Sequence, residues 1–208
     1  MKKHIALLIS VLPGNALRVL FYRVLFGFRI RNSRVGFGTA IAVKSFDMQD
    51  AAIGRFCRFF GPMEVEIGEK STIGHSNQFL CSEWTKNASA WSYQPRLLLG
   101  THTLITSGHY FDVSATMELG DRSWIAGYAS QFWTHGPDIG CKDIHIGSDC
   151  YIGSAATFCP GAAIGSRVLV GAGSVVTEKI GADDAIVAGV PATIKKARYD
   201  WRNKKHLS

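Results

Sequence analysis

Residues 146–177 read IGSDCYIGSAATFCPGAAIGSRVLVGAGSVVT, and this stretch decides the fold. Every sixth position from residue 146 is apolar, giving Ile, Ile, Phe, Ile, Val and Val at positions 146, 152, 158, 164, 170 and 176. A period of six fits neither the 3.6-residue repeat of an amphipathic helix nor the two-residue alternation of a long strand. It fits short strands joined by corners, with one aliphatic residue per hexad pointing inward and a glycine or small residue permitting each bend.

The same step continues toward the N-terminus. Positions 35, 41, 53 and 59 are Val, Ile, Ile and Phe, and Asp47 is the exception. Three hexads make one triangular coil, and coils stacked about 4.8 Å apart give a parallel β-helix of roughly seven coils. The sequence therefore predicts an all-β solenoid over residues 35–191, whose open ends need caps.

The charge is concentrated at the two ends of the chain. The 208 residues include 23 Lys and Arg against 16 Asp and Glu, a formal charge of +7. Residues 1–34 hold seven basic residues and no acid, and residues 192–208 hold six basic residues and one acid, so the body between them is mildly acidic. A nucleic-acid-binding domain collects its Lys and Arg on one folded face. This distribution argues against a nucleic-acid partner.

Residues 1–34 form a basic and apolar N-terminal segment. A short helix is predicted over residues 15–28, capped by Asn15 and closed by Gly27. This helix either caps the first coil or lies in the plane of an anionic membrane. Residues 5–12 are apolar, but a bilayer-spanning helix needs about 20 residues. Residues 192–208 are predicted to be a basic C-terminal tail.

The five cysteines form no C-x-x-C pair and are odd in number. Neither a disulfide framework nor a zinc knuckle is indicated. Reduced thiols favour a cytoplasmic location, with peripheral contact at the inner face of a membrane as an option left open by the N-terminal segment.

Three segments of the repeat resemble the hexapeptide-repeat acyltransferases, whose β-helix is left-handed. They are YIGSAATFCPGAAIG from Tyr151, VGAGSVVT from Val170 and AGVPATIKK from Ala188. The resemblance covers about residues 35–196 and is greatest for the branch that O-acetylates sugars. It implies acetyl-CoA as acyl donor, no metal, a sugar or lipid-linked saccharide as acceptor, and a homotrimer with active sites between subunits.

Two interruptions of the repeat indicate where function lies, because a strict solenoid is featureless. The first covers about residues 80–98 and contains Trp84, Trp91 and Tyr93, which we interpret as an acceptor-binding flap. Aromatic faces there could stack on a sugar while the loop excludes water. The second covers residues 132–144 and contains Trp133, which we include among the acceptor-binding residues.

The second interruption also contains His135, at the place where the resembled family has its catalytic histidine. An imidazole with a pKa near 6.5 can take the proton of a sugar hydroxyl as it attacks a thioester. Asp138 could orient this ring or could be a turn residue. His109 lies one coil earlier and faces a different corner. It is either a second site residue, contributed to the sugar pocket or to a neighbouring subunit, or a histidine with only a structural role at its corner.

The resemblance also implies a set of acyl-donor residues toward the C-terminal coils. Lys196, beside other basic residues, would meet nucleotide phosphates. Glu178 departs from the pattern, because relatives commonly have Lys there. The full set of matching positions is Tyr151, Ser154, Ala172, Thr177 and Lys196.

Three alternative functions remain open from the sequence. An N-acetyltransferase of an amino sugar could use the same base. A γ-carbonic-anhydrase-like zinc protein shares the β-helix but needs three converging histidines, and no pair in this chain matches that spacing. A non-catalytic assembly subunit would bind no acetyl-CoA.

Overall fold

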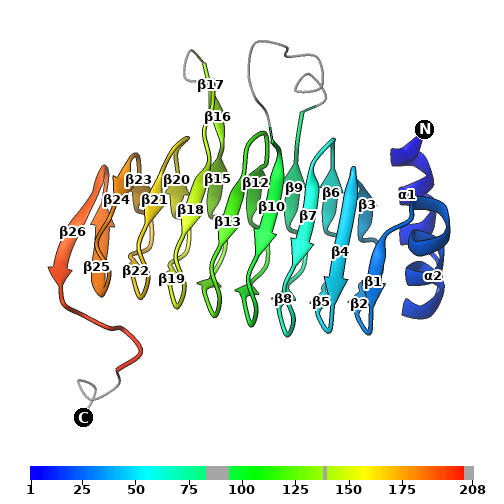
Figure 1. Cartoon of the computed structure of the whole chain (residues 1–208), viewed down its shortest axis with the longest axis horizontal. Coiled ribbons are helices and arrows are strands. Elements are labelled where there is room, and N and C mark those ends of the chain that lie inside the picture. Colours follow the sequence, from blue (N-terminus) through cyan, green and yellow to red (C-terminus); the bar gives the residue numbers. More distant parts are fainter. Residues whose placement is uncertain (83–93, 138–139, 204–208) are drawn as a thin grey trace.

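The computed structural model describes residues 1–82, 94–137 and 140–203. Two helices lie at one end of a solenoid of short strands, and the chain advances along the solenoid from the helices to the C-terminus (Figure 1). Three parallel sheets form its three sides, with strands from successive coils hydrogen-bonded side by side. The fold is the expected left-handed parallel β-helix.

The three sides follow each other in every coil, and we name them sheets A, B and C. Sheet A contains β1 (Arg29–Arg31), β4 (Ser45–Gln49), β7 (Glu64–Ile67), β10 (Arg96–Leu99), β13 (Met117–Leu119), β18 (Ile144–Ile146), β21 (Ala163–Ile164) and β24 (Lys179–Ile180). Sheet B contains β2 (Arg34–Val35), β5 (Ala52–Ile53), β8 (Thr72–Ile73), β11 (Leu104–Ile105), β14 (Trp124–Ile125), β19 (Tyr151–Ile152), β22 (Leu169–Val170), β25 (Ala185–Gly189) and β26 (Ala192–Ala197). Sheet C contains β3 (Ala40–Ala42), β6 (Arg58–Phe60), β9 (Gln78–Leu80), β12 (Tyr110–Asp112), β15 (Gln131–Trp133), β20 (Thr157–Phe158) and β23 (Val175–Val176).

Two elements depart from this parallel arrangement. β16 (His135–Gly136) and β17 (Gly140–Cys141) form an antiparallel hairpin outside the coil. β26 returns antiparallel to β25 at the C-terminal end. β1 already pairs with β4, so the parallel sheets begin a few residues before the predicted start at residue 35, and β25, the last parallel strand, ends at Gly189.

The period-six positions are the core, as predicted. All ten apolar residues in the register are at most 5% exposed. Asp47 breaks the register because β4 is five residues long, and its neighbours Phe46 and Met48 point inward instead.

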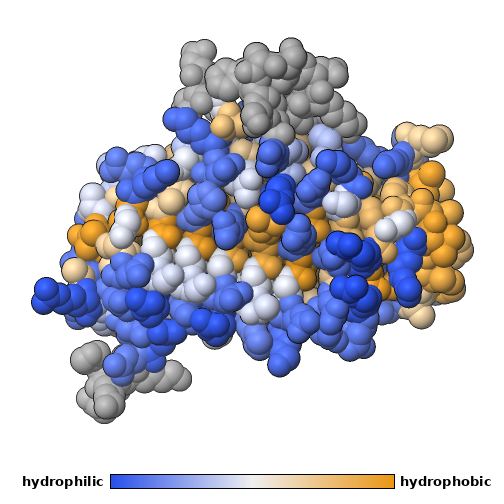
Figure 2. Space-filling model, viewed as in Figure 1, coloured by the Kyte–Doolittle hydropathy of each residue, from blue (hydrophilic) through white to orange (hydrophobic). Residues whose placement is uncertain are grey.

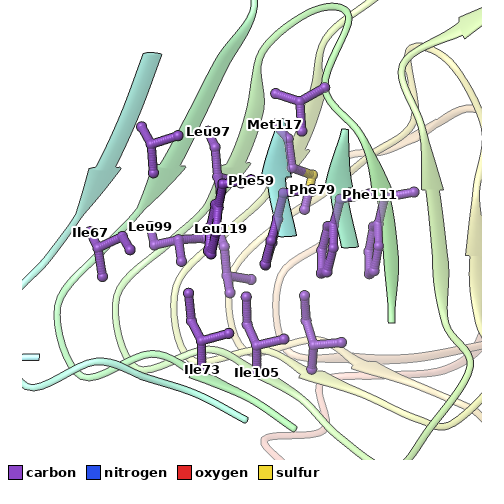
Figure 3. Close-up of a cluster of buried hydrophobic side chains, with 14 of the residues drawn as sticks. Phe59, Ile67, Ile73, Phe79, Leu97, Leu99, Ile105, Phe111, Met117 and Leu119 are labelled. Atoms are coloured by element: carbon purple, nitrogen blue, oxygen red, sulfur yellow. The ribbon is translucent and has the colours of Figure 1, made fainter. Parts of the chain in front are cut away.

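Five phenylalanines on sheet C form a continuous column inside the solenoid. The rings of Phe59, Phe79 and Phe111 lie face to face in a row (Figure 3), with centroids 4.5 Å apart at each step. Phe132 and Phe158 extend the column at 4.6 and 5.2 Å. Each ring is fully buried, so the core is a stack of equivalent side chains, one per coil.

The glycine of each aliphatic–glycine pair has a different role from the one expected. At the corners between sheets A and B, the residues with positive φ are not glycines; examples are Asp149 and Arg167. Gly147 itself has an ordinary φ, but a Cβ there would lie 2.5 Å from the carbonyl oxygen of Gly165. The glycine is needed because backbones of successive coils approach closely, and the bend is made by the residue two positions after it.

The first coil is covered by α1 (Lys2–Ser10) and α2 (Asn15–Phe26). The Tyr22 hydroxyl is fully buried, accepts a hydrogen bond from the Ile41 N–H and lies 3.0 Å from the Thr39 carbonyl oxygen. Arg18 donates to the Val35 carbonyl. These contacts occupy backbone groups that the open end of the solenoid would leave unpaired.

The predicted cap of this helix is partly wrong. Gly27 closes it in the left-handed conformation, as expected, but Gly14 is the N-cap residue and Asn15 lies inside the helix. The Asn15 side chain accepts from the Val35 N–H and donates to the Ser33 carbonyl. Through these two hydrogen bonds, the Asn15 side chain connects α2 to the first coil.

The predicted C-terminal tail is folded back on the solenoid as far as Asn203. After β26, the Trp201 indole donates to the Asp149 carbonyl at 2.7 Å, and Arg202 forms an ion pair with the Asp149 carboxylate at 2.7 Å. The backbone N–H of Tyr199 bonds to the Asp184 carbonyl.

His109 lies at the corner between sheets B and C, immediately before β12, and is 1% exposed. Its Nδ1 accepts from the Ser130 N–H at 3.1 Å, and its Nε2 lies 2.9 Å from the Thr106 hydroxyl. Burial lowers the pKa of His109 to about 4. Of the two roles left open for His109, the structure favours that of a structural corner histidine, because both ring nitrogens are used inside the corner and the ring is buried.

We expect Phe111→Ala to lower the free energy of unfolding by about 3–5 kcal/mol, because it removes a ring contacted on both faces and leaves a cavity. Denaturant unfolding at fixed protein concentration measures this effect. Tyr128→Ala is the control, since Tyr128 is 67% exposed and its truncation is expected to cost about 0.5 kcal/mol or less. Equal losses in the two variants would contradict the structural role of the column.

Burial of His109 predicts a loss of stability in acid. The unfolded chain protonates this histidine near pH 6.5 and the folded chain only near pH 4. Its contribution is complete above about pH 6.5 and declines as the pH falls toward 4, by about 3 kcal/mol in full. We expect unfolding free energies measured from pH 7 to 4.5 to fall less steeply in His109→Gln than in the wild type. His4→Gln, in the exposed part of α1, is the control, and identical slopes in all three proteins would contradict the assignment.

Candidate active site

The second interruption leaves the solenoid at the corner between sheets C and A. It is shorter than predicted, because Phe132 remains in the phenylalanine column and Ile144 begins β18, both fully buried. The Lys142 N–H bonds to the Thr134 carbonyl and closes the base of the hairpin. His135, the first residue of the hairpin, is therefore held where the coil and the excursion meet (Figure 1).

Asp112 lies beneath His135, at the end of β12 in the preceding coil. Its Oδ2 is 2.7 Å from Nδ1 of His135. The Asp112 side chain is only 4% exposed, whereas that of His135 is 33% exposed. A buried carboxylate thus supports a histidine whose ring reaches the surface.

The carboxylate of Asp112 is held by three further hydrogen bonds. Oδ1 accepts from the Ser114 hydroxyl at 2.8 Å. Oδ2 accepts from the Thr134 N–H at 3.0 Å and from its hydroxyl at 2.9 Å. The Thr134 oxygen in turn accepts from the N–H groups of Ser114 and Ala115. This network fixes the carboxylate and stabilises its charge.

An ionised carboxylate only accepts hydrogen bonds, so Nδ1 of His135 is the nitrogen that carries the hydrogen. The lone pair of the neutral ring is then on Nε2. A histidine whose tautomer and orientation are set by a buried aspartate is the arrangement used in general-base catalysis. The negative charge of Asp112 also acts on Tyr110, whose pKa is raised by burial and by this carboxylate.

The sequence nominated Asp138 for this orienting role and did not indicate Asp112. Asp138 lies outside the described residues. Asp112 is 23 residues before His135, and they meet because the ladder between β12 and β15 places Asp112 opposite Trp133. Aligning the coils residue by residue could have revealed it.

Trp133 stands on β15, two residues before His135, and is partly buried. Its ring centroid is 4.8 Å from that of Tyr110 on the neighbouring strand, and its indole N–H donates to Gln131 at 3.1 Å. The other predicted acceptor-binding residues, Trp84, Trp91 and Tyr93, lie outside the described residues.

The predicted acyl-donor residues are at different corners. Ser154 and Ala172 lie in successive turns between sheets B and C, where the Gly173 N–H bonds to the Ser154 carbonyl. Thr177 follows β23 at the corner between sheets C and A, the same corner as His135. Within one chain the structure therefore brings Thr177, but neither Ser154 nor Ala172, to the edge that carries His135.

Tyr151 is on sheet B, in an aromatic cluster that includes the C-terminal segment. Its ring centroid lies 6.4 Å from that of Trp124 and 5.4 Å from that of Trp201. Periodicity gave no indication of Trp201, because residues after β26 do not follow the hexad.

Lys196 is on β26, with its ammonium group 4.6 Å from the centroid of the Tyr199 ring. It lines a groove of about 570 Å³ with three carboxylates, those of Asp183, Asp184 and Asp200. Arg202 lowers the pKa of Asp200 to about 2, so that group is ionised at neutral pH. Arg198 also lines the groove, and the three carboxylates pair with Arg167 and Arg202. The phosphate contact of Lys196 remains a prediction.

Across residues 1–82, 94–137 and 140–203, no group of three or more His, Cys, Asp or Glu side chains is placed to hold a metal ion. His145 pairs with Glu118 at 2.9 Å.

Comparison with known proteins relates the chain to hexapeptide-repeat enzymes. Residues 143–178 match the family described as bacterial transferase hexapeptide (six repeats). A chloramphenicol acetyltransferase of Agrobacterium fabrum strain C58 is 31% identical over 114 residues, which are 50% of this chain and 53% of that protein. The chain thus spans about half the length of this curated relative.

Solved structures show the same fold over most of the chain. A hexapeptide-repeat acetyltransferase of Vibrio cholerae O1 biovar eltor, complexed with acetyl coenzyme A, has a TM-score of 0.53 at 23% identity, over 96% of this chain and 86% of that one. A polysialic acid-specific acetyltransferase has a TM-score of 0.56 at 19% identity, over 84% and 83%. The chain therefore has the left-handed β-helix fold of these acetyltransferases, and its residues 143–178 match the hexapeptide-repeat model.

Proposed function

We propose that this chain is an acetyl-CoA-dependent O-acetyltransferase that transfers an acetyl group directly to a hydroxyl of a sugar or a surface-polysaccharide precursor. The observation that carries the proposal is the pair of His135 and buried Asp112, 2.7 Å apart, at the corner where the hairpin leaves the coil. The acetyl-CoA bound to one structural neighbour and the polysialic acid specificity of another support the donor and acceptor classes.

His135 would act as the general base. Its Nε2 takes the proton of the acceptor hydroxyl while the oxygen attacks the thioester carbonyl carbon. Asp112 stabilises the imidazolium that forms, because their hydrogen bond then joins opposite charges. When the carbon–sulfur bond breaks, the imidazolium returns the proton to the CoA thiolate, and the products are the acetyl ester and free CoA.

The neighbourhood of His135 suits a saccharide. Tyr110 and Trp133 present aromatic rings on adjacent strands within two residues of Asp112 and His135. Apolar ring faces of this kind pack against the C–H faces of a sugar, and the polar groups beside them can pair its hydroxyls.

The positions of the predicted donor residues favour an active site between subunits. Ser154 and Ala172 lie at one end of the sheet C strands and His135 at the other. A donor held between two copies of the chain could touch one set on each copy. This supports the predicted homotrimer, in which the B–C corner of one subunit would face the C–A corner of its neighbour.

We expect Asp112→Asn to lower kcat by about 10²–10⁴-fold with little change in KM, because an asparagine can hold the wrong ring tautomer and cannot stabilise the imidazolium. His135→Ala should lose at least as much. Transfer of radiolabelled acetyl groups from acetyl-CoA to maltose, chloramphenicol and deacetylated surface polysaccharide measures the effect.

Asp138→Asn is the matched control, since it removes the carboxylate nearest to His135 in the sequence. It is expected to retain wild-type kcat. If Asp138→Asn is inactive and Asp112→Asn is not, the assignment of the orienting residue is wrong. If wild-type protein neither binds CoA by calorimetry nor transfers acetyl groups, the chain is a non-catalytic subunit.

The chemical stability of the product separates O- from N-transfer. An acetyl ester is cleaved by hydroxylamine at neutral pH, whereas an N-acetyl amide is stable. We expect hydroxylamine to release the transferred label, and label that stays on an amino sugar would instead establish N-acetylation.

A further inference from the structure

The two helices that cap the first coil expose many large apolar side chains on their outer side. We call this surface the end face, and its residues are Leu7, Leu8, Val11, Leu17, Leu20, Phe21, Val24 and Leu25, each between 38% and 70% exposed. Figure 2 shows hydrophobic residues gathered at the α1 and α2 end of the molecule. A solenoid cap that only faces water has a polar outer side. The end face therefore needs an explanation beyond capping.

The exposed apolar residues of α2 form a stripe of their own. They recur at residues 17, 20, 21, 24 and 25, which is the spacing of one helix face. The buried residues Arg18 and Tyr22 occupy a different face, directed at the first coil. Only the face with Arg18 and Tyr22 contacts the solenoid. The opposite face of α2, which points away from the protein, is apolar.

Charge around the end face is of one sign. No acidic residue precedes Asp47 in the sequence. Lys2 begins α1, and Arg23 lies on α2 beside the apolar stripe, and both are exposed. The Lys3 ammonium group is instead directed at the Phe60 ring of β6, 5.8 Å from its centroid. Asp47 itself pairs with Arg29 and Arg31 on sheet A. An apolar stripe bordered by cations is the pattern of a helix that lies in the interface of an anionic bilayer.

We propose that the end face binds the surface of an anionic lipid bilayer, with the apolar side chains of α1 and α2 inserted among the lipids and Lys2 and Arg23 at the headgroups. Neither helix crosses the bilayer, because no helix in the described part of the chain is long and apolar enough to do so. A second copy of the chain is a poorer partner. Two end faces in contact would bring like charges together with no acidic residue to neutralise them.

The full-length protein can be tested by flotation with vesicles. We expect it to float with vesicles of equal parts phosphatidylglycerol and phosphatidylcholine, and far less with phosphatidylcholine alone. Leu20→Gln combined with Val24→Gln should lower the partition coefficient about tenfold or more, because two inserted side chains become polar. Arg23→Gln should lower it about fivefold on anionic vesicles and have no effect on neutral ones.

Ala16→Gln is the matched control, since residue 16 is exposed on α2 but lies outside the stripe. It should bind like the wild type, and circular dichroism should show all variants folded. Equal flotation of the wild type and the double variant, or no flotation of the wild type, would overturn the proposal. The proposal would also be overturned if the wild type bound no vesicles but self-associated in sedimentation experiments, and the double variant lost that self-association. None of these readouts involves acetyl transfer, so the result is independent of the proposed activity.

Discussion

Stacking of one coil directly on the next is the constraint on which the whole structure depends. Parallel strands hold successive backbones about 4.8 Å apart, so each residue has an equivalent above and below it. Phe111 consequently lies between Phe79 and Phe132 in a continuous column. Gly147 can carry no side chain because the backbone of Gly165 is already there. The same stacking places Asp112 below His135, so the candidate site is a product of the ladder and not of the sequence around the histidine.

Much of the fold could be predicted because the hexad is a local pattern. The inward positions from Ile146 to Val176 and the helix after residue 14 were found where expected. Asp112 could not be assigned in the same way. Its relation to His135 depends on how many residues its coil contains, and the paired Phe111 and Phe132 are 21 residues apart, whereas the paired Ile146 and Ile164 of the regular repeat are 18 apart. Trp201 could not be predicted because the residues after β26 do not follow the six-residue repeat, so its contact with Asp149 has no signal in the sequence.

The two excursions leave the solenoid at one corner. β9 and β15 are both sheet C strands, and in each case the chain re-enters on a sheet A strand, β10 or β18 (Figure 1). Asp112 ends the sheet C strand between them, and that coil has no insertion. The solenoid thus supplies the fixed carboxylate of Asp112, and the hairpin of β16 and β17 begins with the histidine that this carboxylate orients.

The orientation of the solenoid connects the end face with the candidate site. His135 follows β15, the fifth sheet C strand from the helices, so four coil spacings, about 20 Å, separate its coil from the first one. The layer of helices adds about 10 Å. If the end face lies on a bilayer, the coil axis rises from the membrane and the site is held at about this height. A free sugar gains nothing from such an arrangement, whereas a saccharide carried on a membrane lipid reaches that height with a few sugar units. A trimer about an axis parallel to the coils would place three end faces in one plane, and weak contacts would then combine into stable attachment. The proposed membrane surface and the proposed active site would thus both suit one acceptor class, a lipid-linked saccharide.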